Sequence, residues 1–138
     1  MDPNNPVVRL CVLGMECEGQ GRFDDASQLF MNAWTKSTDD FERSIAAHYV
    51  ARHQKSAADT LLWNQRSLDH ADAVRDGRVR EFYPSLYLNL GKAHEDLGNR
   101  DDARRFYEMA AAVLNSLPDD RYGNTVRDSV QRAVARVR

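Results

Sequence analysis

One spacing pattern occurs twice in this chain of 138 residues and strongly limits what the chain can fold into. The first copy starts at Gly14 and the second at Gly91. Counted from either glycine, a second glycine follows at +7, an alanine at +12, an aromatic residue at +16 and another alanine at +19. These positions hold Gly21, Ala26, Phe30 and Ala33 in the first copy and Gly98, Ala103, Tyr107 and Ala110 in the second. Such repetition indicates a repeat architecture.

Apolar residues recur with a helical period along almost the whole chain, which predicts about seven helices and an all-α fold. We expect helices near 7–17, 24–34, 41–53, 57–74, 84–97, 101–117 and 121–137. The fifth helix begins either close to Pro84 or near Val79 with a bend, because proline fits only the first turn of a straight helix. The chain shows no strand or hairpin signal and no linker, so we predict one domain over residues 1–138.

Composition excludes few classes of protein. The apolar fraction of 42% and the net charge of −2 are ordinary for a globular domain and give no overall case for nucleic acid or an anionic membrane. The polar start with two prolines is unlike a signal peptide, and Leu10–Met15 is too short to span a bilayer. We therefore expect a cytoplasmic protein in which Cys11 and Cys17 are free thiols.

The two copies resemble the tetratricopeptide repeat (TPR), a helix–turn–helix unit with small and aromatic residues at set places. The resemblance implies a right-handed α-solenoid of antiparallel helix pairs. We expect units near 7–40, 41–78 and 79–117 and a capping helix over 120–138. The middle unit departs from the pattern, because His48 stands where a small residue is expected and Asn64 replaces the aromatic. Trp63 is a candidate for the missing bulk.

The resemblance also implies a function, since TPR stacks bind proteins or peptides in a groove lined by the first helix of each unit. We therefore expect a non-catalytic scaffold or adaptor that binds an unidentified protein or peptide. The groove candidates are Tyr49, Arg52, His53, Asn89, Lys92 and Glu95. Four of them, Arg52, His53, Asn89 and Lys92, resemble the polar clamp that holds a peptide carboxylate in some TPR domains. The alternative is that they are solvated side chains on exposed helix faces.

Motifs for chemistry do not occur. There is no nucleophile elbow, Walker-type loop or dinucleotide fingerprint, and no His-Glu-x-x-His or Cys-x-x-Cys spacing. We expect no catalytic residue, metal ion or cofactor, and we interpret Asp24-Asp25 and Asp101-Asp102 as helix starts. The C-terminal segment carries five arginines, which either contact nucleic-acid phosphates or form the solvated face of a capping helix. They are Arg121, Arg127, Arg132, Arg136 and Arg138.

Two further functions stay open at this point. The chain could be a structural protein that self-associates through a convex or N-terminal face, where we expect Val7 and Val8 to be poorly covered. It could also be an enzyme, or an accessory protein of RNA modification, with a site near His48, Arg52, His53 and Trp63.

Overall fold

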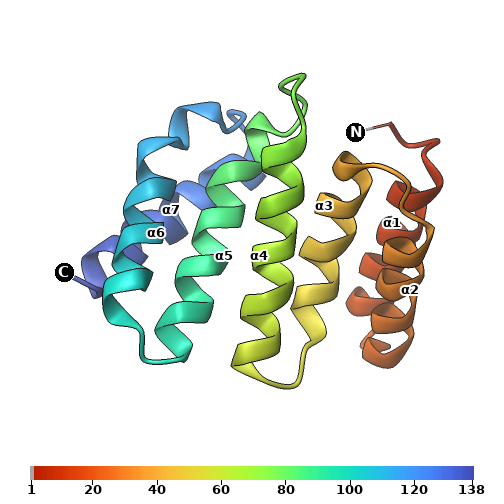
Figure 1. Cartoon of the computed structure of the whole chain (residues 1–138), viewed down its shortest axis with the longest axis horizontal. Helices are drawn as coiled ribbons and strands as arrows, with labels where there is room; N and C mark the ends of the chain where they lie inside the picture. Colours follow the sequence, from red (N-terminus) through yellow and green to blue (C-terminus); the bar gives the residue numbers. More distant parts are fainter. Residues whose placement is uncertain (1) are drawn as a thin grey trace. The chain divides into compact units, whose positions relative to one another are not determined.

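The computed structural model describes residues 2–138, and within them it contains helices and no strand. Seven α-helices follow one another along this described range (Figure 1). They are α1 (Pro6–Gly19), α2 (Phe23–Lys36), α3 (Asp40–Val50), α4 (Ala57–Ala73), α5 (Tyr83–Asp96), α6 (Arg100–Ala112) and α7 (Arg121–Arg136). Short 3-10 segments lie at Ala51–His53 (η1), Arg80–Phe82 (η2) and Leu114–Ser116 (η3). The all-α class with about seven helices is therefore confirmed.

The chain divides into two compact units. The first unit, Met1–Arg75, contains α1 to α4, and the second, Asp76–Arg138, contains α5 to α7. Within the units, α1 pairs with α2, α3 with α4, and α5 with α6, each pair running antiparallel (Figure 1). These three pairs are the helix–turn–helix units that the sequence predicts.

Side-chain caps begin four of the helices. Asn5 accepts hydrogen bonds from the amides of Val7 and Val8 at the start of α1, and Ser56 accepts one from Asp59 in α4. Asp39 and Asp120 cap α3 and α7 in the same way. In contrast, α2 and α6 have no side-chain cap, and each instead carries an aspartate pair in its first turn. These carboxylates lie at the positive end of the helix dipole, where negative charge is stabilised, as expected for helix starts.

Two helix ends differ from the sequence-based ranges, whereas the fifth helix starts close to Pro84, which is one of the two starts predicted for it. The third helix leaves α geometry after Val50 and continues to His53 as the 3-10 segment η1. The fifth begins at Tyr83, with Pro84 in the first turn where the missing amide proton costs no hydrogen bond. The sixth ends at Ala112, short of the expected Leu117, because Val113 leaves the helical region and a 3-10 turn through Asn115 and Ser116 follows.

Each glycine that opens the repeated pattern lies under the aromatic ring of its own copy. A Cβ atom added to Gly14 would collide with the ring of Phe30, and one added to Gly91 would collide with the ring of Tyr107. Both rings are fully buried. The glycine–aromatic pair therefore sets how closely the two helices of a unit approach.

The middle pair, α3 and α4, packs without a glycine–aromatic contact. Asn64 is buried at the place of the aromatic, and Trp63 packs half-buried against the core cluster that contains Phe30. Ser44 and Ser67 join the two helices instead: each hydroxyl donates to the other residue's carbonyl oxygen, at 2.9 and 2.7 Å. Small hydroxyl side chains thus allow a close helix approach while their polar groups remain satisfied.

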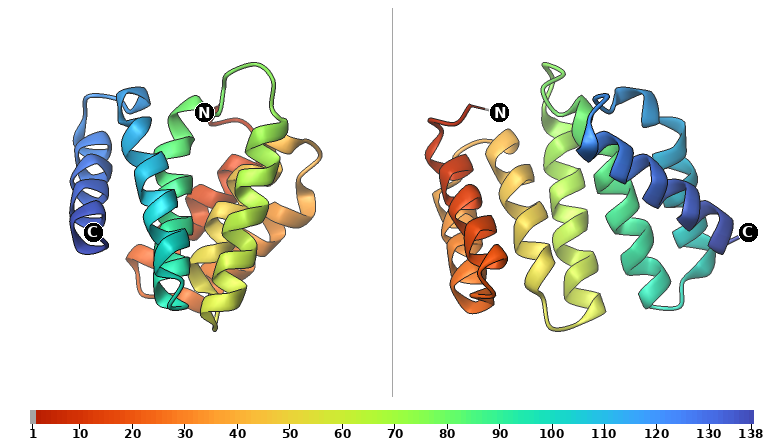
Figure 2. Two further views of the ribbon diagram at one scale, coloured as in Figure 1. Left: turned by 60° about the vertical axis from the view of Figure 1, so that its left-hand side comes forward. Right: turned by 180° about the vertical axis from the view of Figure 1, so that it is seen from behind.

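In the second unit, α7 lies across α5 and α6 (Figure 2). Its buried residues Val126, Val130 and Ala133, together with Val137 just after its end, pack against Ala103, Tyr107, Ala110 and Leu117. An amphipathic helix in this position covers the apolar face that the last helix pair of a repeat would otherwise expose. The predicted capping helix is present.

The first testable prediction concerns the glycine–aromatic packing. Gly14→Ala should lower the free energy of unfolding by about 1–3 kcal/mol, because the new methyl group overpacks against a buried ring that has no free space. Urea unfolding followed by far-ultraviolet circular dichroism measures the change.

Gly19→Ala is the matched control, since nothing lies within 4 Å of a Cβ atom at that position. It should leave stability unchanged or raise it by up to about 1 kcal/mol through helix propensity. Equal stability of the two variants would contradict the role given to Gly14.

Candidate functional site

In the first unit, three groove candidates lie together near the largely buried carboxylate of Glu18. They are Tyr49, Arg52 and His53. His53 Nε2 lies 2.6 Å from Glu18 Oε2, and Arg52 Nη2 lies 3.0 Å from Glu18 Oε1. The Glu18 side chain is only 13% exposed, whereas that of Arg52 is 45% exposed. The carboxylate at the end of α1 is therefore held by both basic residues of η1.

Aromatic contacts complete this cluster. The Phe30 ring stacks on Tyr49 at 5.2 Å and on His53 at 5.8 Å between ring centroids. The Arg52 guanidinium lies 5.4 Å from the centroid of the Tyr49 ring, within the range of cation–π attraction. Because Phe30 also covers Gly14, the packing of α1 on α2 fixes the position of Tyr49 and His53.

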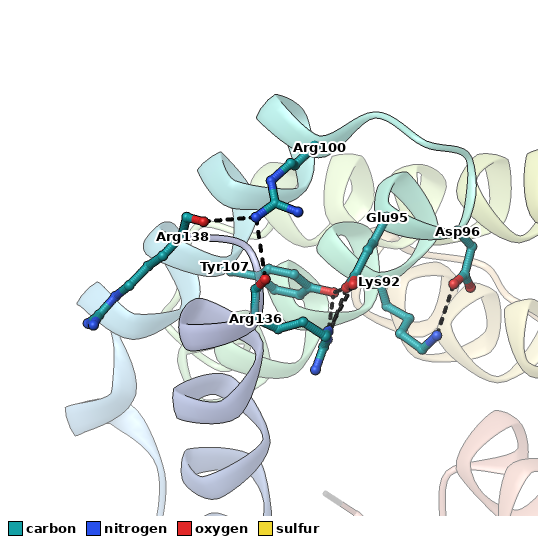
Figure 3. A network of polar contacts seen from close by, with 7 residues as sticks. All are labelled: Lys92, Glu95, Asp96, Arg100, Tyr107, Arg136 and Arg138. Atoms are coloured by element: carbon teal, nitrogen blue, oxygen red, sulfur yellow. Dashed lines mark hydrogen bonds and ion pairs between the residues drawn. The ribbon is translucent and has the colours of Figure 1, made fainter.

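The second unit contains a corresponding cluster around Glu95 (Figure 3). Arg136 of α7 donates to both Glu95 oxygens, at 2.8 and 2.9 Å, and the Tyr107 hydroxyl donates to Glu95 at 2.6 Å. Arg100 and Arg104 of α6 donate to the carbonyl oxygens of Arg138 and Val137. The end of α7 is thus fastened to both helices beneath it.

The contacts within this network shift the pKa values of its three titratable groups, Glu95, Tyr107 and Arg136. Hydrogen bonds from Arg136 and then Tyr107 lower the pKa of Glu95 to about 2, against the effect of burial. Burial and the nearby Glu95 raise the pKa of Tyr107, so the phenol stays protonated and donates. Hydrogen bonding to Glu95 raises the pKa of Arg136. The network therefore holds one fixed negative and one fixed positive charge over the whole neutral range.

Glu18 and Glu95 occupy the same place in their repeats. Each lies at +4 from the first glycine of its copy of the pattern. Each contacts side chains of a later element: Glu18 contacts Arg52 and His53 of η1, and Glu95 contacts Arg136 of α7. Sequence reasoning placed both glutamates on the groove side of their helices but named only Glu95 as a candidate, and it did not foresee that either is paired within the chain. The shared offset from the glycine was the signal that could have identified Glu18 as well.

The six candidates therefore form two groups. Tyr49, Arg52 and His53 lie together in the first unit around Glu18. In the second, Lys92 and Glu95 lie one turn apart on α5, and Lys92 pairs at 3.0 Å with Asp96. Asn89 is half-buried on the same helix. The two groups belong to different compact units, and a groove shared by them stays a prediction.

The arginines of α7 are largely engaged within the second unit. Arg127 donates to the carbonyl oxygen of Leu117, Arg132 pairs with Asp128, and Arg136 pairs with Glu95. These contacts neutralise or satisfy three of the five charges that could have contacted phosphates. They favour the interpretation of this segment as a capping helix.

His48 has a different environment from that of the other histidines. Burial, and then the charge of Arg52, lower its pKa to about 4, so the ring is neutral at pH 7. Its ring packs edge-on against Tyr49 at 5.0 Å. Among the described residues, no group of three His, Cys, Asp or Glu side chains is placed to hold a metal ion.

Two other features bear on the predictions from sequence. Cys11 and Cys17 are buried free thiols, and burial raises the pKa of Cys11 to about 12. In residues 2–138, no helix combines the length and the apolar character needed to cross a bilayer.

The second testable prediction concerns the pH dependence of the Glu95 contact. Glu95→Gln should cost about 1–2 kcal/mol of unfolding free energy at pH 7, a value reduced by the solvent exposure of Arg136. The folded pKa of Glu95 is about 2, below its unfolded value, so acid protonates the unfolded chain first. The stabilisation is therefore complete above roughly pH 5 and is lost as pH falls towards 2.

Urea unfolding of both proteins between roughly pH 7 and 3 measures this difference. Glu108→Gln, at an exposed carboxylate of α6, is the control and should stay within about 0.5 kcal/mol of the wild type. A difference between wild type and Glu95→Gln that stays constant with pH would contradict the assignment.

The chain is similar to known proteins in sequence and in fold. No protein-family model matches the chain. Photosystem I assembly protein Ycf3 from Synechococcus elongatus, and the same protein from a second Synechococcus strain, are each 29% identical over 105 residues, 71% of this chain. The chain spans 57% of the length of these curated relatives.

A solved structure is similar over a larger part of the chain. PcrH from Pseudomonas aeruginosa aligns over 97% of this chain and 92% of its own, with a TM-score of 0.63 and 16% sequence identity. The repeated glycine–aromatic packing, the three antiparallel helix pairs and these likenesses agree with one another. The chain therefore has an all-α fold of antiparallel helix pairs that is similar to the fold of TPR-type helical repeats.

Proposed function

We propose that this chain is a non-catalytic protein-interaction module that holds a protein or peptide segment on the first helices of its repeats. The observation that carries the proposal is the repeat scaffold itself. Between α1 and α2, and between α5 and α6, buried rings pack against the glycines. Polar and aromatic side chains of the first helices stay accessible. Repeat proteins use such surfaces for binding. The curated relatives are assembly proteins by name, which supports the same class of function.

The ion pairs bear on how a partner is bound. A carboxylate clamp needs cations with unsatisfied charge, but Arg52 already pairs with Glu18, which also contacts the His53 ring, and Lys92 pairs with Asp96. A partner carboxylate would therefore compete with carboxylates of this chain. This favours recognition through mixed aromatic and polar contacts over a C-terminal carboxylate clamp, which we keep as the second mode of binding.

The accessible side chains that support recognition differ between the units. In the first, Arg52 lies over Tyr49, so a partner meets a guanidinium plane backed by an aromatic ring. Arginine and tyrosine are enriched at the centres of protein interfaces because they supply large contact areas together with hydrogen bonds. In the second, Lys92 is 63% exposed and Glu95 is 28% exposed.

The third testable prediction is the loss of partner capture when two of these charges are removed. Arg52→Gln combined with Lys92→Gln keeps a polar side chain at each position and removes two charges without placing new acids beside Glu18 or Asp96. Affinity capture from the native host, analysed by mass spectrometry, should then lose the specific partner at least about tenfold, which corresponds to about 1.4 kcal/mol.

Lys36→Gln combined with Arg105→Gln is the matched control, with the same charge change on exposed positions of α2 and α6. This control should retain capture. Equal capture by both double variants would overturn the assignment to the first helices. Once a partner segment is mapped, amidation of its C-terminal carboxylate distinguishes the two modes, because only a clamp would lose affinity.

A further inference from the structure

The outer face of α1 carries a stripe of exposed residues with an apolar centre. The members of this α1 stripe are Pro6, Arg9, Val12, Leu13, Glu16 and Gly19, all exposed. Val12 is 43% exposed and Leu13 is 47% exposed, while Val7 and Val8 are 2% and 4% exposed. The expectation that Val7 and Val8 are poorly covered is therefore wrong: they point into the unit, and the uncovered apolar pair lies one turn further on.

The position of α1 leaves this stripe open. Within the first unit, α1 stands at one end of the series of helices, with α2 as its pair and no further helix of that unit outside it (Figure 2). The second unit contains α7 over its last helix pair, whereas the described residues of the first unit, 2–75, form no corresponding helix over α1. In repeat proteins such an end needs a cover with a polar outer surface.

The two charges of the stripe have no partners within the described part of the chain. Neither the Arg9 guanidinium nor the Glu16 carboxylate forms an ion pair or a side-chain hydrogen bond there. They cannot reach each other easily, because two turns of α-helix separate them by about 10 Å along the axis. The face thus presents one positive charge and one negative charge, with two apolar residues between them.

The order of these residues is symmetric about the middle of the helix. Arg9 and Glu16 lie equally far from the midpoint between Val12 and Leu13, and Pro6 and Gly19 lie equally far beyond them. In an antiparallel pair of such helices, Arg9 of each copy faces Glu16 of the other copy. Val12 and Leu13 of both copies then meet at the centre, and the small or ring-closed residues at the ends leave room for close approach. A parallel pair would place like charges opposite each other.

We propose that the α1 stripe is a self-complementary surface whose occupant is the same stripe of a second copy, in an antiparallel two-fold pair. Closed two-fold dimers use the same patch on both subunits, and this charge order satisfies that condition. The pairing lies apart from the proposed groove residues and goes beyond the proposed function. One helix face is smaller than the interfaces of permanent dimers, so the association is weak and depends on salt.

The fourth testable prediction uses charge exchange. In sedimentation velocity at low salt, the wild type should shift from monomer to dimer between roughly 5 and 500 μM, the range expected of a weak interface. Arg9→Glu alone and Glu16→Arg alone should each stay monomeric over this range, since each places two pairs of like charges across the two-fold axis.

Two recombinations then test the antiparallel geometry. A chain with both Arg9→Glu and Glu16→Arg should dimerise again, because the exchange restores both ion pairs. An equimolar mixture of the two single variants should also dimerise, since one copy then contributes two acids and the other two bases. No parallel or unrelated contact predicts recovery in both experiments.

The controls separate misfolding and groove effects from dimerisation. Lys36→Glu, at an exposed position of α2, should leave the dimer unchanged, and circular dichroism should show that every variant keeps the wild-type helix content. Partner capture by the single variants should equal that of the wild type. A wild type that remains monomeric at the highest concentration, or a mixture of single variants that does not associate, overturns the proposal.

Discussion

The close approach of paired helices at Gly14 and Gly91 is the constraint on which the rest of this structure depends. The Phe30 and Tyr107 rings fill the space that a side chain at the glycine would occupy, and both rings are fully buried. These rings also contact the next element of their own unit: Phe30 stacks on Tyr49 and His53, and Tyr107 lies under Arg136. The contact between glycine and ring inside a repeat therefore also positions the side chains through which that repeat contacts the following element.

The same repeat geometry also places an acid near each ring. Glu18 and Glu95 are equivalent, and each accepts contacts from basic residues that a ring helps to position. The consequence is electrostatic. The basic side chains proposed from sequence for a charged ligand, Arg52 and Lys92, are already paired with acids of this chain. An anionic ligand gains little free energy from a cation that must first leave its partner. The surfaces of the first helices are thus more nearly neutral than their lysine and arginine content indicates.

The middle repeat shows that the fold does not need the glycine–aromatic pair at every step. Ser44 and Ser67 form reciprocal hydrogen bonds between α3 and α4, and Asn64 is buried where the other repeats have a ring. Glu42 adds a further link: burial raises its pKa, but hydrogen bonds from Thr38 and Asn5 outweigh this effect and lower the pKa overall. Through Asn5, this carboxylate joins the start of α1 to α3. Polar contacts here replace the packing that apolar residues provide elsewhere.

The sequence by itself determined the helical class, the two regular repeats and the covering role of α7. These features follow from short-range spacing, which periodicity and turn chemistry make visible. Only the tertiary structure decided which charges are paired and which valines of α1 are covered. Glu18 meets His53 35 positions away, and Glu95 meets Arg136 41 positions away. No local pattern specifies such a partner, because it depends on how whole helices pack.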